Sequence, residues 1–493
     1  MTTEKIKKEY SEDKSVIPPV QEKTSETHHQ IKIKGKTLKY KVTAGTILLK
    51  EEDLEKGEKE KASVFYIAYE LEGVKEHASR PITFSFNGGP GSSSVWMHLG
   101  VLGPKRVLLD NDGKPFNPPY ELVDNQYTLL EASDLVFIDP VSTGFSRTVP
   151  NEKPEQFHNV EKDIQSVGDF IRLWTTRNQR WTSPKFLIGE SYGTTRAAGL
   201  SEYLHRRHGM YLNGIMLVSS ILNFMTARFD PGNDLPYILF LPTYTATAWY
   251  HNKLDDDLQQ DFQKTLQESK SFALNEYTLA LMKGNTLTRN ERTEIAQKLA
   301  RYTGLGESYI EGSNLRIHIY RFCKELLRDE NITIGRLDSR YTGFDRDSVG
   351  EIHEIDPSYS AILGPYSSTM NDYLRSDLQF DLDLPYEILS SVHETWTFKP
   401  FQGQYVNTGE YLRNAFQYHP GLKVIVLNGY FDLATPYLAT EYTFNHIELP
   451  PEQQSNISMK YYHAGHMMYL HIPSLEQMSR DLKKFVLDST IKG

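Results

Sequence analysis

One short run of residues has the composition and setting of a catalytic nucleophile: Gly189-Glu190-Ser191-Tyr192-Gly193. It follows the apolar stretch 185–188 and precedes the small-residue stretch 194–204, which suits a helix. This order predicts a strand, a sharp turn and a helix, with Ser191 at the turn. Flanking glycines permit the strained backbone that exposes a serine hydroxyl at the edge of a sheet. The competing interpretation is an ordinary glycine-rich loop, since the chain holds 32 glycines.

The serine needs partners from distant parts of the sequence. A hydroxyl is a weak nucleophile, so a base must take its proton and an acid must orient that base. In α/β-hydrolases these groups follow one another along the chain as serine, aspartate and histidine. Here the predicted strand 422–427 leads into a loop with Asp432, and the predicted strand 458–462 leads into a loop with His466. Both loops are expected at the sheet edge that carries Ser191, which predicts the triad Ser191, His466 and Asp432.

Other interpretations exist for two of these three residues. Asp432 lies in a glycine-containing loop and could serve only as a turn residue. The chain has 16 histidines, and His463 is the main competitor of His466. We favour His466 because the preceding Gly465 lets the backbone turn the imidazole back toward the sheet.

An acyl intermediate also requires donors for its oxyanion. The run 87–94, Asn-Gly-Gly-Pro-Gly-Ser-Ser-Ser, directly follows the predicted strand 82–86, and its glycines let backbone N–H groups approach a substrate closely. We assign the oxyanion hole to the amides of Gly89 and Tyr192. A phosphate-binding loop is the rival interpretation, but no lysine ends this loop as it does in a Walker motif.

The pattern of apolar residues predicts the elements that position these groups. Alternation over 31–42 and 62–71 predicts antiparallel strands that open a sheet. Short apolar runs at 82–86, 135–138 and 214–218 predict strands buried on both faces. A helix before the nucleophile is predicted from the spacing of Ile164, Val167, Ile171 and Trp174. Strands that alternate with helices indicate the α/β class, here an α/β-hydrolase fold with a mostly parallel central sheet and helices on both faces.

The sequence divides into three predicted parts: a polar, disordered arm at 1–28, an α/β-hydrolase core formed by 29–220 and 416–493, and a helix-rich cap inserted at 221–415. Within the cap, Thr288 and Glu291 predict a capping box, and Gly304 predicts a helix stop. A last amphipathic helix is predicted over about 474–487.

Composition narrows the classes of function. The formal net charge of −10 disfavours nucleic acid as a partner. No run approaches the roughly 18 apolar residues of a membrane span, and the start lacks the apolar region of a signal peptide. With Cys323 as the only cysteine, these features favour a reducing, cytoplasmic compartment. No metal or organic cofactor is expected, because His205 and His208 have helical spacing but lack further zinc ligands.

These motifs together resemble the serine carboxypeptidases, a branch of the α/β-hydrolases. The resemblance rests on the runs 87–94, 140–146 and 189–193 and on the loops of Asp432 and His466, which occur in the order found in that family. It implies an enzyme that releases one residue at a time from the carboxyl end of a peptide substrate.

The resemblance also assigns the substrate's terminal carboxylate to Asn87 and Glu190, helped by the amide of Gly88. An asparagine can donate directly, but a second carboxylate attracts only if one of the two carries a proton. Many relatives pair this glutamate with a second one, and Val101 stands at that position here. We therefore expect Glu190 to ionise more easily unless burial or another partner raises its pKa. This departure predicts a less acidic working pH than the family's, or a weaker preference for a free carboxylate.

Two further departures concern sulfur. Ser92 replaces the cysteine that the family carries after its Pro-Gly pair, so sensitivity to thiol reagents should be absent. The family's disulfides are missing as well. The sequence thus resembles a bacterial-type, intracellular member of a family that is usually secreted or vacuolar.

The sequence predicts a serine-type carboxypeptidase, and two other functions compete with it. An esterase or acyltransferase would use the same triad, because the acyl-enzyme is shared and only the acceptor differs. A non-catalytic binding protein on a hydrolase scaffold is disfavoured by the presence of Ser191, Asp432 and His466 in the expected order. Side-chain preference and oligomeric state are not predicted.

Overall fold

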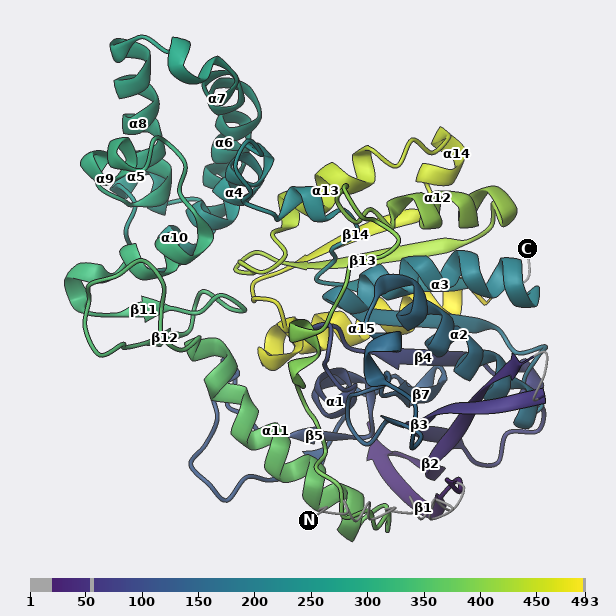
Figure 1. Ribbon diagram of the computed structural model, residues 1–493. Coiled ribbons are helices and arrows are strands. Elements are labelled where there is room, and N and C mark those ends of the chain that lie inside the picture. Colours follow the sequence, from purple (N-terminus) through teal and green to yellow (C-terminus); the bar gives the residue numbers. More distant parts are fainter. Residues whose placement is uncertain (1–19, 54–56, 491–493) are drawn as a thin grey trace, which may run out of the picture.

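The computed structural model describes residues 20–53 and 57–490. Over these residues the chain forms a ten-stranded sheet in the order β1-β2-β3-β7-β4-β9-β10-β13-β14, with β8 paired to β3 (Figure 1). Its strands are β1 Thr24–Ile33, β2 Lys36–Asp53, β3 Gly57–Leu71, β4 Ile82–Phe86, β7 Asp134–Ile138, β8 Arg147–Thr148, β9 Lys185–Glu190, β10 Gly214–Val218, β13 Lys423–Gly429 and β14 Ile457–Tyr462. The six strands from β7 to β14 run parallel, which confirms the mostly parallel central sheet.

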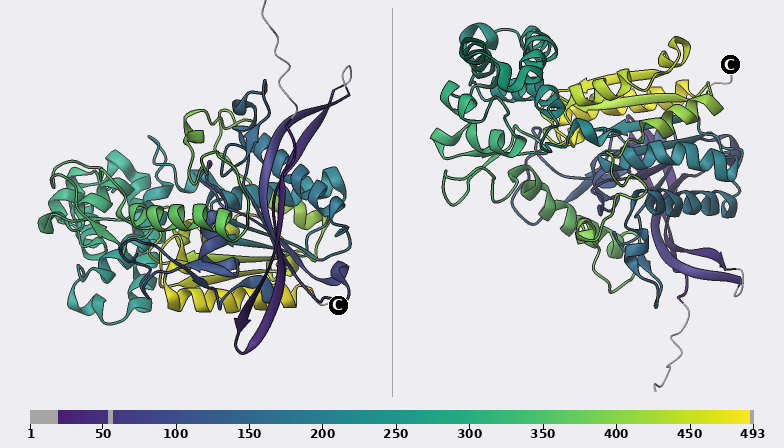
Figure 2. Two further views of the ribbon diagram at one scale, coloured as in Figure 1. Left: turned by 90° about the horizontal axis from the view of Figure 1, so that it is seen from below. Right: turned by 45° about the horizontal axis from the view of Figure 1, so that its top comes forward.

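The sheet begins with long antiparallel strands, β1 to β3, which curve along its edge (Figure 2). The stretch 31–42, predicted as one strand, is in fact the end of β1, a turn at Lys34 and Gly35, and the start of β2. Polar residues continue β1 back to Thr24, because pairing with β2 satisfies its backbone whatever the side chains are. The predicted disordered arm at 1–28 is therefore wrong for residues 24–28, and its residues 1–19 lie outside the described residues.

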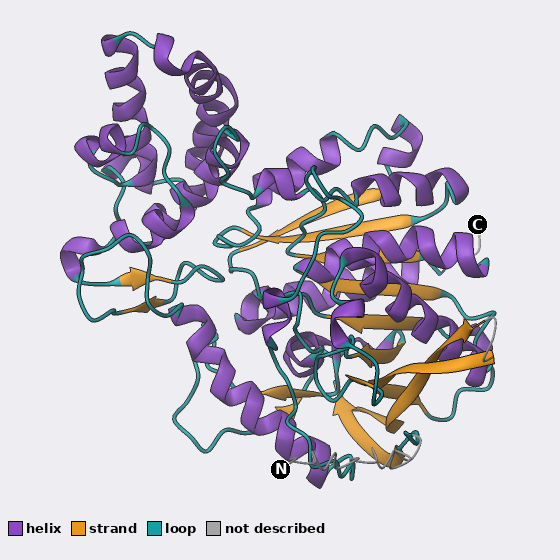
Figure 3. Ribbon diagram, viewed as in Figure 1, coloured by secondary structure: helices purple, strands orange, loops and turns teal. Residues whose placement is uncertain are grey.

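Alternate side chains of the central strands enter two separate hydrophobic clusters, one on each face of the sheet. On β9, Leu187 joins one cluster and Ile188 the other, and on β13 Val424 and Ile425 divide in the same way. Helices cover both faces (Figure 3). The α3 face is covered by α2 Val160–Arg177, α3 Tyr192–His208 and α12 Gly409–Tyr418. The α15 face is covered by α1 Val95–Met97, α11 Pro357–Ser376 and α15 Ile472–Asp488.

A helical region with its own hydrophobic cluster lies to one side of the sheet (Figures 1 and 2). Its helices are α4 Leu235–Tyr250, α5 Asp256–Gln259, α6 Phe262–Phe272, α7 Thr278–Lys283, α8 Arg289–Thr303, α9 Glu307–Gly312 and α10 Ile319–Glu325. The capping box of Thr288 and Glu291 is confirmed, and α8 ends at Gly304 in a left-handed conformation. Short antiparallel strands follow, β11 Thr333–Ile334 and β12 Thr342–Gly343.

The predicted end of the cap at 415 does not follow the packing. The boundary at 415 falls inside α12, whose Leu412 and Phe416 are buried in the cluster on the α3 face. Helix α11 likewise places Tyr366 and Met370 in the cluster on the α15 face. Residues 357–415 thus contribute to the cores of the sheet, since the apolar sides of α11 and α12 find their partners there.

The remaining strands and α-helices are short. They are β5 Lys105–Val107 paired with β6 Leu122–Asp124, α13 Tyr437–Asn445 and α14 Pro451–Gln454. Among the helices in the described part of the chain, none has both the length and the apolar character needed to cross a bilayer.

Candidate active site

Ser191 lies at the sharp turn between β9 and α3. Its backbone has a positive φ of 59° with ψ of −128°, a conformation that costs energy for a residue with a side chain. The turn is held because the Ser191 amide donates to the Val218 carbonyl at 3.0 Å. The flanking glycines are required sterically: a Cβ on Gly193 would lie 2.8 Å from the Phe86 carbonyl oxygen, and one on Gly189 would collide with Gly193.

Asp432 and His466 meet in the loops that follow β13 and β14. The Asp432 carboxylate lies 2.8 Å from Nδ1 of His466, and it also accepts hydrogen bonds from the amides of Ala434 (2.8 Å) and Thr435 (2.9 Å). Burial by itself lowers the pKa of His466, but the Asp432 carboxylate outweighs this effect and raises the pKa above its usual value. A carboxylate with these donors holds the ring and leaves Nε2 as the nitrogen available to the serine.

His463, the competing base, lies elsewhere. Its ring packs against Phe262 with 4.9 Å between centroids and against Tyr430 at 5.3 Å. It is not among the described residues that line the cavity containing Ser191. The structure therefore favours His466.

Ser191 and His466 line one cavity of about 340 Å³, together with Asn87, Gly88 and Gly89. Within the described residues, no hydrogen bond joins the side chains of Ser191 and His466. Catalytic hydrogen bonds are often long or poorly aligned in active sites without a substrate. A larger hollow of about 590 Å³ lies near α11 and contains none of the predicted catalytic residues.

The two predicted oxyanion donors are available. Neither the Gly89 nor the Tyr192 amide donates to a protein acceptor within the described residues. Their loops lie against each other, since a Cβ on Gly88 would come 2.5 Å from the Tyr192 amide nitrogen. Tyr192 is also the first residue of α3. The free backbone N–H groups at the start of a helix favour the binding of a negatively charged group, here the oxyanion.

Glu190 is buried beside Asn87 and Tyr469. The Tyr469 hydroxyl donates to Oε2 at 3.0 Å, and the side-chain amide of Asn87 donates to the same oxygen. The other oxygen, Oε1, has no partner among the described residues. Burial raises the pKa of Glu190 to about 7, outweighing the charge of His466 and the hydrogen bonds from Tyr469 and Asn87, which lower it.

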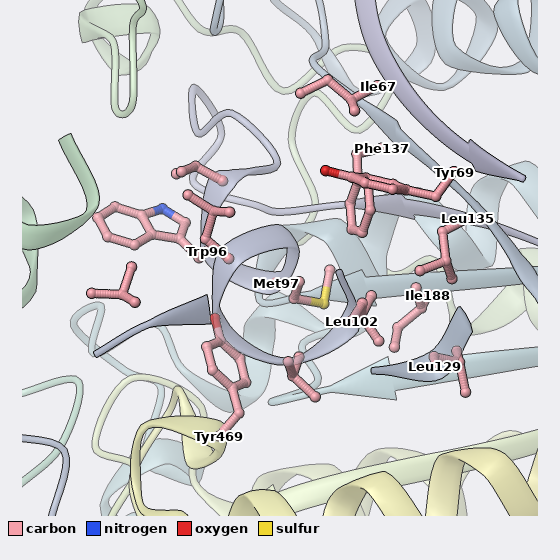
Figure 4. Packing of buried hydrophobic residues seen from close by; sticks show 14 of the residues in the cluster. Ile67, Tyr69, Trp96, Met97, Leu102, Leu129, Leu135, Phe137, Ile188 and Tyr469 are labelled. Atoms are coloured by element: carbon pink, nitrogen blue, oxygen red, sulfur yellow. The ribbon is translucent and has the colours of Figure 1, made fainter. Parts of the chain in front are cut away.

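For Glu190 the stated exception applies, because burial raises its pKa. Val101 does leave the glutamate without a second carboxyl partner, but Val101 itself is buried in the hydrophobic cluster on the α15 face. Tyr469, shown in Figure 4, reaches Glu190 from the far end of the sequence. Its ring occupies space next to Gly100, where any Cβ would collide with it. Desolvation supplies the pKa increase that a second glutamate would otherwise give.

A buried ion pair braces the loops around the site. Arg196 of α3 binds Asp163 of α2 through two hydrogen bonds of 2.8 and 3.0 Å. Its remaining guanidinium nitrogen donates to the Asn87 carbonyl at 2.7 Å, and the Tyr192 hydroxyl donates to Asp163 at 3.2 Å. The brace thus joins both substrate-facing loops to the helices on the α3 face.

A second support comes from the run Arg336-Leu337-Asp338-Ser339-Arg340, here called the clamp segment. The Leu337 carbonyl accepts the His466 amide at 2.6 Å, and the Asp338 carboxylate accepts the Gly465 amide at 3.0 Å. The clamp segment also reaches the aspartate loop, since the Leu433 amide donates to the Arg336 carbonyl at 3.1 Å. It therefore fixes the loops of both Asp432 and His466.

Asp139, which directly precedes the loop 140–146, supports the oxyanion loop. The Asp139 carboxylate accepts the Ser94 amide at 2.8 Å, and burial raises the pKa of Asp139 to about 7. Gly144 packs directly against this carboxyl group, where a side chain could not fit.

The structure places no metal cluster at the site or elsewhere: across residues 20–53 and 57–490, no three His, Cys, Asp or Glu side chains gather as metal ligands do. His205 bonds the Tyr211 hydroxyl at 2.7 Å and His208 bonds Asp169 at 3.1 Å, so both have structural partners.

Sequence reasoning missed Tyr469, Arg196, Asp163 and the clamp segment. Arg196 and Asp163 carry one available signal, because charged residues stand among apolar neighbours in predicted buried helices. Tyr469 and the clamp segment carry none, since their contacts span more than a hundred residues of sequence.

Comparison with known proteins identifies related sequences and a related fold. A profile of the serine carboxypeptidase family matches residues 53–472. Serine carboxypeptidase-like 34 from Arabidopsis thaliana is 28% identical over 233 residues, which cover 42% of this chain and 41% of that protein. Serine carboxypeptidase-like 38 from the same plant is 31% identical over 188 residues, 36% of each. The chain thus matches about two fifths of the length of these curated relatives.

A solved structure has the same fold. A prohormone-processing carboxypeptidase from Saccharomyces cerevisiae aligns with a TM-score of 0.56 over 91% of both chains, at 17% identity. Since the family profile spans most of the sequence as well, the chain belongs to the serine carboxypeptidase family.

Proposed function

We propose that the protein is a serine-type carboxypeptidase that releases C-terminal residues from peptides through an acyl-enzyme. The observation that carries this proposal is a single cavity in which Ser191 and His466 stand next to Asn87 and the buried carboxyl group of Glu190. A nucleophile beside a carboxyl that can hold a proton suits a substrate whose scissile bond lies close to a free carboxylate.

In the proposed reaction, Ser191 Oγ attacks the carbonyl carbon of the last peptide bond and passes its proton to Nε2 of His466. Asp432 holds the ring and stabilises the imidazolium that forms. The amides of Gly89 and Tyr192 donate to the developing oxyanion. His466 then protonates the leaving amine, and a water molecule activated by the same imidazole hydrolyses the acyl-enzyme.

The terminal carboxylate of the substrate is bound by Asn87 and Glu190. Because Oε2 of Glu190 already accepts hydrogen bonds from Asn87 and Tyr469, the unpartnered Oε1 is the oxygen that can carry a proton and donate it. A neutral Glu190 donates to a carboxylate, whereas an ionised one repels it. This pair gives the proposed preference for a free carboxyl end.

The proposal is tested by comparing a blocked dipeptide with a free carboxyl end with the same peptide as a C-terminal amide. We expect the free acid to be cleaved at least tenfold faster by the wild type, and neither to be cleaved by Ser191→Ala. Rapid cleavage of esters without cleavage of the free acid would instead identify an esterase. A wild-type protein that fails to react with a fluorophosphonate, which labels activated serines, would identify a non-catalytic protein.

We further propose that the enzyme works inside the cell, in a cytoplasmic and reducing compartment. The support is its cysteine content: the single Cys323 is buried in the helical region, so no intrachain disulfide can form. Fractionation of the source cells with an antibody against the protein would test this location.

A further inference from the structure

One wall of the catalytic cavity carries polar groups that have no hydrogen-bond partner among residues 20–53 and 57–490. This cap wall consists of Tyr320 of α10, Arg336 between β11 and β12, His353 before α11, and Tyr359 of α11. Within the described residues, no hydrogen bond involves any of these four side chains' polar atoms. The same cavity contains Ser191, so the cap wall lines the space that a substrate enters.

Arg336 is the positively charged residue of the cap wall. Its backbone is fixed, because its amide donates to Asp356 at 3.2 Å and its carbonyl accepts from Leu433 at 3.1 Å. Its half-buried guanidinium makes no ion pair or ring contact with any described residue. Arg336 is also the only arginine or lysine among the described residues that line this cavity. The positive charge of Arg336 lowers the pKa of His466.

No acidic side chain among the described residues forms a direct ion pair with this cation. The Asp356 carboxylate lies in the same lining, but it accepts hydrogen bonds from its own helix, from the Ser358 amide at 3.0 Å and from the Ser358 hydroxyl. The guanidinium of Arg336 is not within ion-pair distance of that carboxylate. Glu190 is the other acid of the cavity. Its pKa is raised to about 7, so its carboxyl group is mostly protonated at pH values below 7.

His353 adds a second polar group next to the cation. Its Nδ1 is buried without a partner, and its ring meets Tyr320 edge to face with 5.7 Å between centroids. Burial lowers the pKa of His353, so the ring is neutral near pH 7 and can donate one hydrogen bond. Two unpartnered donors on one wall leave a place for an acceptor from outside the protein.

We propose that Arg336, assisted by His353, binds a carboxylate side chain on a substrate residue next to the scissile bond. A guanidinium binds a carboxylate through two parallel hydrogen bonds, and it does so most strongly where water is partly excluded. The inference deepens the proposed function, on which it rests, by naming acidic peptides as the preferred substrate class. The carboxylate can belong to the released residue or to the residue that forms the acyl-enzyme.

The test uses matched blocked dipeptides in which glutamate or glutamine occupies either of those two positions, with leucine at the other. Glutamine has the shape of glutamate without its charge. We expect the wild type to prefer glutamate at one position by roughly 10- to 100-fold in kcat/KM, the range for a hydrogen bond to a charged group. The position with the preference identifies the source of the carboxylate.

In Arg336→Gln the ratio of kcat/KM for glutamate over glutamine peptides should fall to about one, because a change in the pKa of His466 acts on both peptides alike, and Arg336→Lys should retain part of the ratio. The control is Arg346→Gln, which removes an exposed arginine outside the cavity lining and should change nothing. A wild type that does not prefer glutamate at either position overturns the inference. An equal loss for all free-acid peptides in Arg336→Gln also overturns it, because Arg336 would then bind the terminal carboxylate.

The inference and the proposed function fail separately. Protection of Ser191 from a fluorophosphonate by the same peptides measures binding without hydrolysis. If no peptide is cleaved, the carboxypeptidase proposal fails, and stronger protection by the glutamate peptides that is lost in Arg336→Gln still supports the role of Arg336. Equal protection by glutamate and glutamine peptides overturns that role even if both are cleaved.

Discussion

Glu190 is a single carboxyl group whose chemistry depends on what surrounds it. An exposed glutamate has a pKa near 4.3, whereas burial raises the pKa of Glu190 to about 7. Its hydrogen bonds from Asn87 and Tyr469 favour the ionised form, so burial is the main cause of the raised pKa, with a smaller contribution from the charge of Asp432. The surroundings of this one residue therefore decide at which pH the proposed site can bind a substrate carboxylate.

We expect kcat/KM for free-acid peptides, divided by kcat/KM for the matching C-terminal amides, to fall as the pH rises through about 7, because the titration of His466 affects both substrates and cancels in this ratio. Below that pH Glu190 carries a proton and donates to the substrate, and above it the ionised group repels the carboxylate. Glu190→Gln keeps a donor without a titratable proton, so this decrease should vanish. The measurement is a pH profile between 5 and 9, with a C-terminal amide as the control substrate. A decrease of the same size in Glu190→Gln would contradict the assignment.

Tyr469→Phe removes one hydrogen bond that stabilises the ionised form of Glu190. We expect the pKa of Glu190 to rise, so that the decrease in kcat/KM moves to higher pH by about half a unit to one unit, since one unit equals about 1.4 kcal/mol. The matched control is Tyr462→Phe, which removes a buried hydroxyl that donates to Asp481 instead. A shift toward lower pH would show that Tyr469 does not act in this way.

At the scale of helices, strands and loops, the catalytic loops are held in place by residues that lie outside the catalytic sequence motifs. The clamp segment holds the loops after β13 and β14, and the pair of Asp163 and Arg196 ties α2 and α3 to the Asn87 loop. Both supports satisfy backbone groups that would otherwise be buried without partners. They explain how loops from distant parts of the chain keep a common geometry.

Asp338→Asn weakens the contact of the clamp segment with the Gly465 amide. We expect kcat to fall by roughly 10- to 100-fold with little change in KM, because a small displacement of His466 misaligns proton transfer. Fluorophosphonate labelling of Ser191 should slow in parallel. Asp329→Asn, an exposed change in the same region, serves as the control. A folded variant with full kcat would show that the contact is dispensable.

Arg196→Ala leaves the Asp163 carboxylate buried and unpaired, since the two side chains are only 1% and 6% exposed. We expect the free energy of unfolding to fall by about 3–5 kcal/mol. The matched control on the same helix is Arg206→Ala, which breaks a pair whose arginine is 64% exposed and should change stability far less. Urea denaturation measures both, and equal effects would contradict the role of the brace.

At the scale of the whole molecule, the helical region and the sheet share residues. Leu433, next to Asp432 in the loop after β13, is buried in the hydrophobic cluster of the helical region. The clamp segment adds hydrogen bonds between the two parts. The helical region should therefore not open independently of the catalytic loops.

The reactivity of Cys323 can show whether the helical region opens independently of the catalytic loops. Cys323 is fully buried in the helical region, and burial raises the pKa of its thiol. We expect iodoacetamide to leave the native protein unmodified and to label Cys323 only at urea concentrations where activity is lost. The measurement is labelling by mass spectrometry beside residual activity. Labelling of fully active protein would show that the helical region opens by itself.

Much of the fold could be predicted from the sequence because its signals are local. The apolar runs of β4, β9 and β13 and the glycines around Ser191 constrain their own backbone within a few residues. The start of β1 was missed because its polar residues carry no apolar alternation. The end of the cap was misplaced because the amphipathic pattern of α12 does not say which core it packs against.

The sequence by itself determined that a serine stands at a strand–helix turn and that an aspartate and a histidine follow later strands. Parallel strands bring their carboxyl ends to one edge, so order along the chain is enough for that prediction. Only the tertiary structure decided the protonation of Glu190, the contact with Tyr469 and the exposure of Arg336 to the cavity. These depend on burial and on contacts between distant residues, and no short stretch of sequence specifies either one.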